Sequence, residues 1–173
     1  MTNITESFSS DNKAYSQFRP DYPQALYDFI LEQTKNHTTA WDCATGTGQA
    51  ADILANHFDI VYATDAAKNQ IKEAIIKPNI KYSVATSDKS NLKSNSIDLI
   101  TTAQALHWFA NDEFYTEVKR VAKKDALFAA WCYNSFWEAS DSNITKIWNE
   151  FYDLVSPYFA FGRHYIDERY ETI

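Results

Sequence analysis

Short apolar runs alternate along this chain with longer segments in which apolar residues recur every three or four positions. The short runs are typical of buried strands and the periodic segments of amphipathic helices. Strands that alternate with helices favour parallel pairing through right-handed crossovers, so the pattern predicts an α/β fold built on an open, doubly wound sheet. The five predicted strands are 40–44, 60–64, 80–85, 97–102 and 126–133.

Five helices are predicted around these strands. The third should end before Pro78, and the fourth should begin at an Asn111 cap. The first helix should place its apolar stripe on a core, and the last helix has the cleanest helical period. Their apolar residues are, in chain order, Tyr22, Ala25, Leu26, Phe29 and Ile30; Ala50, Ile53 and Leu54; Ile71, Ala74 and Ile75; Phe114, Val118 and Val121; and Ile144, Ile147, Trp148, Phe151, Tyr152 and Val155.

Composition narrows the class of protein. With 173 residues, the chain suits one domain with a sizeable core. A net charge of -7 disfavours a nucleic-acid partner. Cys43 and Cys132 show no CxxC spacing, so neither a disulfide framework nor a metal site is indicated. Because neither a secretory leader nor an apolar membrane span is present, we expect a cytoplasmic protein without a membrane partner.

Glycine is scarce, and two of the three glycines lie together where the first strand gives way to a helix. Average usage would give about 12 glycines in this length, against 3 here. Gly46 and Gly48 would let a ligand lie against bare backbone and its N–H groups. The alternative is a tight turn that only requires glycine. A ligand-binding turn is the favoured interpretation.

Acidic residues follow the next two strands. Asp65 ends the second strand, where a carboxylate can accept hydrogen bonds from both hydroxyls of a ribose, or can cap the next helix. Asp88 follows the third strand and could accept a hydrogen bond from an adenine amino group, although taken alone it fits a solvated loop better. The pattern predicts a nucleoside site.

Imidazole and aromatic groups gather after the fourth strand, in residues 103–109. His107 is the candidate to accept a proton from a substrate, and a packed histidine at a helix end is the alternative. Near the amino end, Tyr15 and Arg19 belong to an aromatic and basic segment that could close over the site, with Arg19 clamping a carboxylate. A purely structural lid is the alternative.

With these segments in place, the chain resembles class I S-adenosylmethionine-dependent methyltransferases with a Rossmann-like fold, in particular the small-molecule enzymes related to trans-aconitate methyltransferase. The resemblance spans almost the whole chain. It is carried by YSQFRPDYP (15–23), WDCATGTGQAA (41–51), ATDAAKNQI (63–71), Ser87 with Asp88, and SIDLITTAQALHWF (96–109).

The resemblance implies the cofactor S-adenosyl-L-methionine and a role for each matching residue. Tyr15 and Arg19 would close over cofactor and acceptor, and Trp108 with His107 would line the acceptor side. The remaining cofactor-binding residues follow by part of the cofactor: Asp42, Ala44, Thr45, Gly46 and Gly48 for methionine, Asp65 and Ala66 for ribose, Ser87 and Asp88 for adenine, and Ala103 and Gln104 beside the sulfonium.

Two departures from the family pattern stand out. Ala44 occupies a position where the family most often has glycine. Residues 162–173 look like the approach to a further strand, whereas such enzymes continue with two more strands in an antiparallel edge. We therefore expect a truncated chain whose fifth strand is an exposed edge, which predicts self-association. The expected organisation is a single domain with a lid and helix (1–35), a cofactor-binding core (36–135) and an incomplete carboxyl-terminal part (136–173).

The predicted function is methyl transfer to a small-molecule acceptor. A carboxylate would need no base, whereas a hydroxyl or a carbon acid would gain from one, and the sequence leaves both choices open. Two alternatives stay open. An NAD(P)-dependent oxidoreductase would prefer a third glycine where this chain has Ala51. A truncated, non-catalytic methyltransferase-like protein would instead bind a partner through its open sheet edge.

Overall fold

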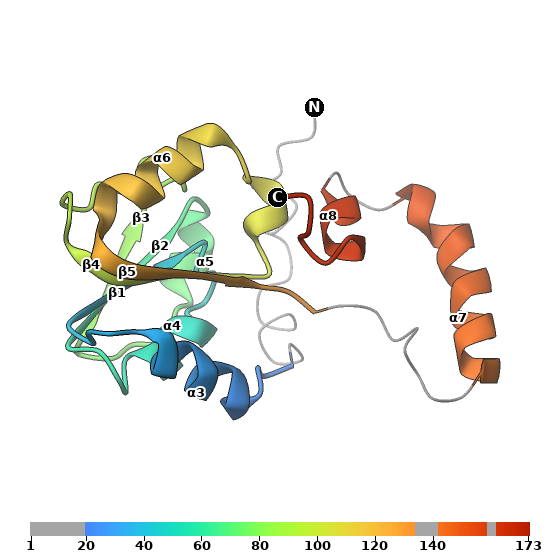
Figure 1. Cartoon of the computed structure of the whole chain (residues 1–173), viewed down its shortest axis with the longest axis horizontal. Helices are drawn as coiled ribbons and strands as arrows, with labels where there is room; N and C mark the ends of the chain where they lie inside the picture. Colours follow the sequence, from blue (N-terminus) through green and yellow to red (C-terminus); the bar gives the residue numbers. More distant parts are fainter. Residues whose placement is uncertain (1–19, 134–141, 159–161) are drawn as a thin grey trace.

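A five-stranded, wholly parallel sheet forms the centre of the computed structural model, which describes residues 20–133, 142–158 and 162–173 (Figure 1). The strand order is β3-β2-β1-β4-β5, so β1 and β4 meet where the direction of winding reverses. Such a switch point is where ligands bind in open α/β sheets. The strands are β1 (Thr39–Cys43), β2 (Ile60–Asp65), β3 (Ile80–Val84), β4 (Ile97–Ala103) and β5 (Ala122–Trp131).

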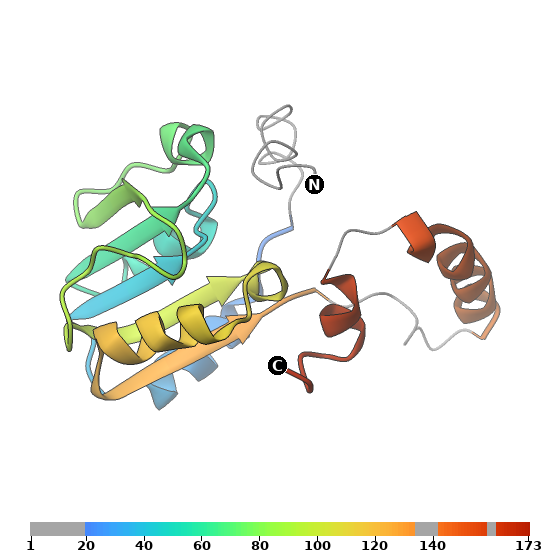
Figure 2. The same cartoon turned by 90° about the horizontal axis from the view of Figure 1, so that it is seen from above.

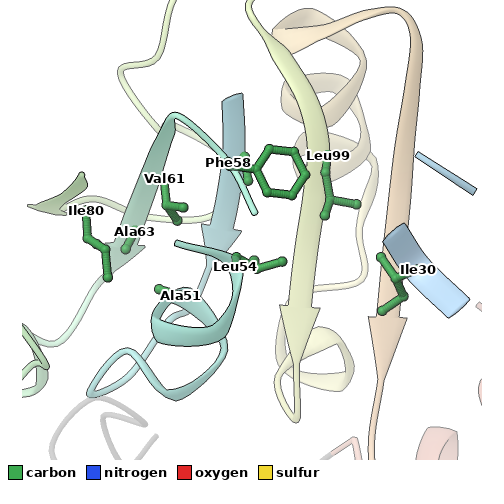
Figure 3. Packing of buried hydrophobic residues seen from close by; sticks show 9 residues of the cluster. Ile30, Ala51, Leu54, Phe58, Val61, Ala63, Ile80 and Leu99 are labelled. Atoms are coloured by element: carbon green, nitrogen blue, oxygen red, sulfur yellow. The ribbon is translucent and has the colours of Figure 1, made fainter. Parts of the chain in front are cut away.

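Helices cover both faces of this sheet, which confirms the predicted doubly wound fold. On one face Ile30 and Leu54 pack against strand residues such as Leu99 (Figure 3). On the other face Phe114 packs in a cluster with Trp41. The helices are α3 (Gln24–Gln33), α4 (Gln49–Leu54), α5 (Lys68–Lys72), α6 (Asp112–Val121), α7 (Ser142–Val155) and α8 (Arg163–Asp167), with 3-10 turns η1 (Leu106–Trp108) and η3 (Ser156–Tyr158).

Two element boundaries and the buried face of one helix differ from the sequence prediction. Helix α5 ends at Lys72 rather than at Ile75, because the Ile75 N–H donates to the Thr47 carbonyl at 3.0 Å instead of continuing the helix. Strand β5 begins at Ala122, directly after α6. In α3, Phe29 was predicted to be buried but is exposed, and Tyr27 is buried in its place. The predicted Asn111 cap is confirmed: its Oδ1 accepts from the Phe114 N–H at 2.9 Å.

The carboxyl-terminal part departs further from prediction. Helix α7 forms as predicted, but none of its residues is buried and it lies apart from the sheet (Figures 1 and 2). Residues 162–173 do not approach a further strand; they form α8 and a series of turns. Buried Gly162 and Ile166 hold this segment against the molecule, so the further strand expected from the family resemblance does not begin here.

Among the described strands, β5 pairs only with β4, so it forms an edge of the sheet as predicted. Association through that edge stays a prediction. No helix in the described ranges combines the length and the apolar character needed to cross a membrane.

Candidate active site

A cavity of about 480 Å³ opens at the carboxyl ends of the strands, on the side where β1, β2, β3 and β4 all end. Its wall combines small residues with acidic and aromatic ones, so backbone is exposed to whatever enters. The residues that line it are Ala44, Gly46, Asp65, Ala66, Ala67, Gln70, Ala85, Thr86, Ser87, Asp88, Ala103, Gln104, Ala105, Trp108, Phe109 and Asn111.

The glycine turn after β1 uses its two glycines for different purposes. Both have left-handed backbone, with φ of +58° at Gly46 and +87° at Gly48. A Cβ on Gly46 would meet nothing closer than Gln70 Oε1 at 3.8 Å, so this glycine leaves open space in the cavity wall. A Cβ on Gly48 would lie 2.1 Å from the Tyr82 hydroxyl. Gly48 therefore admits Tyr82 rather than a ligand.

Ala44 shares the left-handed backbone, with a φ of +58°. A Cβ in this conformation costs roughly 1 to 2 kcal/mol, which is the physical reason a glycine suits this position. We expect Ala44→Gly to raise the free energy of unfolding by up to about 1 kcal/mol, since part of the relief is offset by the freer unfolded chain. Urea denaturation checks this. Ala103→Gly, at a residue without positive φ, should lower stability, and a loss in both variants would contradict the account.

Asp65 combines the two roles that the sequence left open. Its Oδ2 accepts from the Gly46 N–H and its Oδ1 from the Ala67 N–H, each at 2.8 Å. The carboxylate thus ties the glycine turn to the start of α5 while it also lines the cavity. Burial raises the pKa of Asp65, and the two backbone hydrogen bonds oppose that rise. Each oxygen keeps a second lone pair that can accept a ligand hydroxyl.

Asp42 lies beneath the turn rather than in the cavity wall. Its side chain is 1% exposed and accepts from Thr45 Oγ1 at 2.5 Å and from Thr101 Oγ1 at 2.8 Å. Burial raises the pKa of Asp42 to about 6, against the lowering effect of both hydroxyls. Asp42 and Thr45 therefore hold the shape of the turn from below.

The raised pKa of Asp42 predicts a pH dependence of stability. The native state binds this proton more tightly than the unfolded chain, so the contribution of Asp42 to the free energy of unfolding should fall as pH rises from about 4 to about 6. Asp65 contributes with the same sign, so the difference between wild type and Asp42→Asn isolates Asp42. At pH 7 that difference should favour the variant by about 1 to 3 kcal/mol relative to pH 4. Urea denaturation of both proteins at pH 4 and pH 7 measures this. A difference in the free energy of unfolding that is the same at both pH values would contradict the prediction.

His107 is not among the residues that line the cavity. It is buried on η1, and its Nδ1 lies 2.9 Å from the Tyr170 hydroxyl. Burial lowers the pKa of His107 to about 4, with a smaller contribution from Arg163, so the ring is neutral near pH 7. Its neighbours Trp108 and Phe109, by contrast, line the cavity. The geometry favours the packed-histidine alternative over a base that touches the substrate.

Most predicted site residues in the described ranges come together at one wall. Nine of them line the cavity, and four lie outside its lining. Tyr15 and Arg19 fall outside the described residues. The nine are Ala44, Gly46, Asp65, Ala66, Ser87, Asp88, Ala103, Gln104 and Trp108, and the four are Asp42, Thr45, Gly48 and His107.

Several lining residues were not singled out from the sequence. Ala85 and Thr86 follow β3 directly, so the rule that ligands bind at carboxyl ends of strands could have found them. Asn111 was predicted only as a helix cap. Ala105 and Phe109 belong to the segment 103–109, which was predicted beside the site without individual roles for these two residues. Ala67 and Gln70 were missed.

Comparisons with known proteins agree with this arrangement. The methyltransferase domain family matches residues 41–130, which include the glycine turn, Asp65 and η1. A Dictyostelium discoideum protein named as a methyltransferase is 34% identical over 99% of this chain and 66% of its own length. A Saccharomyces cerevisiae protein named as an S-adenosylmethionine-dependent methyltransferase is 27% identical over 75% of this chain and 47% of its own length.

A solved structure shows the same fold. A protein from Anaeromyxobacter dehalogenans, described as a type II methyltransferase, superposes with a TM-score of 0.79 and 33% identity, over 90% of this chain and 66% of that one. The chain thus spans about half to two thirds of the length of these proteins. Because the family match covers more than half of the residues and includes the cavity, this chain belongs to the methyltransferase domain family.

Proposed function

We propose that the cavity binds S-adenosylmethionine and that the protein transfers its methyl group to a small-molecule acceptor. The observation that carries the proposal is the joint position of open Gly46 and hydrogen-bonding Asp65 in the wall of one cavity, inside the part of the chain that matches the family. The yeast relative is named as dependent on the same cofactor.

The cavity residues fit this cofactor. Gly46 leaves room beside the backbone, and Asp65 has lone pairs for ribose hydroxyls. Gln104 Nε2 is buried and has no hydrogen-bond partner among the described residues, so a bound ligand could satisfy it. Ser87 and Asp88 would hold the adenine side, and Ala66 the ribose side, as the resemblance implies.

When bound, S-adenosylmethionine supplies an electrophilic methyl carbon on a positively charged sulfur. The chain has to orient the acceptor and exclude water, which can contribute roughly 7 to 11 kcal/mol to lowering the barrier. Trp108 and Phe109 form the aromatic part of the wall that excludes water. The carboxylates of Asp65 and Asp88 in the same wall favour a cationic group electrostatically.

For the acceptor we propose a small carboxylate, which is already deprotonated and requires no base. This choice agrees with the position of His107, which is not part of the cavity lining. The described part of the cavity wall has two acidic residues, Asp65 and Asp88, which would repel a carboxylate acceptor. We therefore propose that Arg19 of the entry segment neutralises the negative charge of the acceptor.

Mass spectrometry tests the reaction and its acceptor together. The protein is incubated with S-adenosylmethionine and a panel of small carboxylic acids, phenols and amines, and each mixture is searched for a compound that gains one methyl group. We expect methyl esters to form, with a strong loss of product in Arg19→Gln. Methylation of phenols or amines alone would overturn the carboxylate, and no methylated product, with the panel extended to a cell extract, would overturn methyl transfer.

A further inference from the structure

Tyr170 connects the carboxyl-terminal segment (residues 162–173) to the loop that follows β4. Its hydroxyl lies 2.9 Å from His107 Nδ1, and the two rings are stacked with centroids 6.3 Å apart. Its ring also packs against the core cluster around Trp41. Burial raises the pKa of Tyr170, so the hydroxyl stays protonated and can donate its hydrogen bond across the physiological range.

Gly162 forms a second contact between the same two parts of the chain. A Cβ at this residue would lie 2.3 Å from the His107 carbonyl oxygen, and its φ is +94°. Only glycine allows this approach, so the segment fits closely against η1. Ile166 adds an apolar anchor at 6% exposure.

The docked segment reaches the cavity through two neighbouring side chains. His107 follows the buried Leu106 in the chain and precedes Trp108, which lines the cavity. The rings of His107 and Trp108 lie with centroids 4.9 Å apart. A shift of the His107 ring would therefore displace the Trp108 ring, because closely packed rings do not move independently.

Left-handed backbone at the end of the segment supports a specific docked state. Arg169 and Tyr170 have φ of +55° and +62°, although neither is glycine. Two such residues in succession cost energy and persist only where surrounding contacts hold them. Here the Tyr170 N–H donates to the Tyr165 carbonyl at 2.8 Å while the Tyr170 hydroxyl meets His107.

We propose that the carboxyl-terminal segment is part of the ligand site, with Tyr170 as a positioning residue that acts through His107 to hold Trp108 in the cavity wall. This inference rests on the proposed function, because it takes the cavity as the site of an adenosyl ligand. It assigns the predicted His107 a supporting role in place of a catalytic one.

A double-mutant cycle tests the inference with S-adenosylhomocysteine as the probe. Its dissociation constant is measured by calorimetry for wild type, Tyr170→Phe, Trp108→Ala and the double variant, well below each melting temperature. Loss of the hydroxyl should weaken binding by about 3- to 10-fold in the wild-type background. In the Trp108→Ala background the same change should alter the affinity by less than about 2-fold, because Tyr170 acts through Trp108.

Two further variants make the outcome decisive. Tyr158→Phe makes the same chemical change on a side chain that is 87% exposed, and it should bind like wild type. Gly162→Ala should weaken binding by at least as much as Tyr170→Phe and should speed amide exchange in residues 162–173 while the sheet stays protected. It also replaces Tyr170→Phe if that variant does not fold.

Equal affinity of wild type, Tyr170→Phe and Gly162→Ala would overturn the inference, and so would an equal loss from Tyr170→Phe in both backgrounds. These results differ from a failure of the proposed function itself, in which the wild type would not bind the probe at all.

Discussion

Gly48→Ala is expected to lower the free energy of unfolding by about 3 to 5 kcal/mol. The new Cβ would require an unfavourable left-handed backbone and would overlap the Tyr82 hydroxyl, 2.1 Å away. Tyr82 would have to leave its hydrogen bond to the Ile75 carbonyl at 2.8 Å. Chemical denaturation with a probe of the sheet measures the loss.

Gly46→Ala is the matched control for this prediction. Gly46 has a positive φ, as Gly48 has, so an alanine would be strained at either position. The Cβ at residue 46, however, would enter open space in the cavity wall. We expect about 1 to 2 kcal/mol of destabilisation from backbone alone, together with weaker ligand binding. If the two variants lost the same stability, the contact between Gly48 and Tyr82 would not be the reason for this glycine.

Asp65→Ala is expected to reduce stability by about 3 to 5 kcal/mol and to weaken binding of S-adenosylmethionine. Two backbone N–H groups, at Gly46 and Ala67, would lose a charged acceptor, and each such hydrogen bond contributes about 1.5 to 3 kcal/mol. Asp65→Asn should lie between wild type and Asp65→Ala, because an amide has only one acceptor oxygen. Thermal and urea denaturation measure stability, and calorimetry measures binding.

Asp88→Ala supplies the comparison, because it removes an exposed carboxylate from the same cavity. Its effect on stability should stay within about 0.5 kcal/mol, as for most surface substitutions. Should Asp65→Ala prove no more destabilising than Asp88→Ala, the structural role of Asp65 would be refuted.

Much of the fold and of the cavity was predictable because strand and glycine signals in this chain are local. The order of apolar runs predicted five strands. The carboxyl ends of these strands, together with the family resemblance, predicted that Asp65, Ser87, Asp88, Ala103 and Gln104 lie at one site, and all five line the cavity. Parallel strands bring their carboxyl ends to one edge, so residues far apart in sequence meet there.

Other features depend on contacts that a sequence pattern does not show. Gly48 and Gly46 look alike in the sequence, yet only the packing of Tyr82 separates a structural glycine from an open one. His107 could not be assigned as packed until Tyr170, 63 positions away, was seen beside it. The segment from residue 162 was expected to approach a further strand, as the family resemblance implies, whereas it forms α8 and turns that contact η1.

The resemblance to methyltransferases predicted that Asp42 and Thr45 face the methionine part of the cofactor. In the structure these two residues hydrogen-bond to each other and do not line the cavity. Family motifs mark residues that a fold requires as well as those that touch a ligand. Asp42 belongs to the first kind by position, since both of its oxygens accept hydrogen bonds from buried threonines.

Calorimetric titration of S-adenosylmethionine into wild type and Ala103→Leu tests the central claim most directly. Ala103 ends β4 in the cavity wall, and a leucine there would fill ligand space without disturbing a hydrogen-bonded side chain. We predict one-to-one binding to wild type, about 10-fold or more weaker in the variant, and no heat with NAD. Absence of heat with wild type, or equal affinity in both proteins, would contradict the assignment of this cavity to the cofactor.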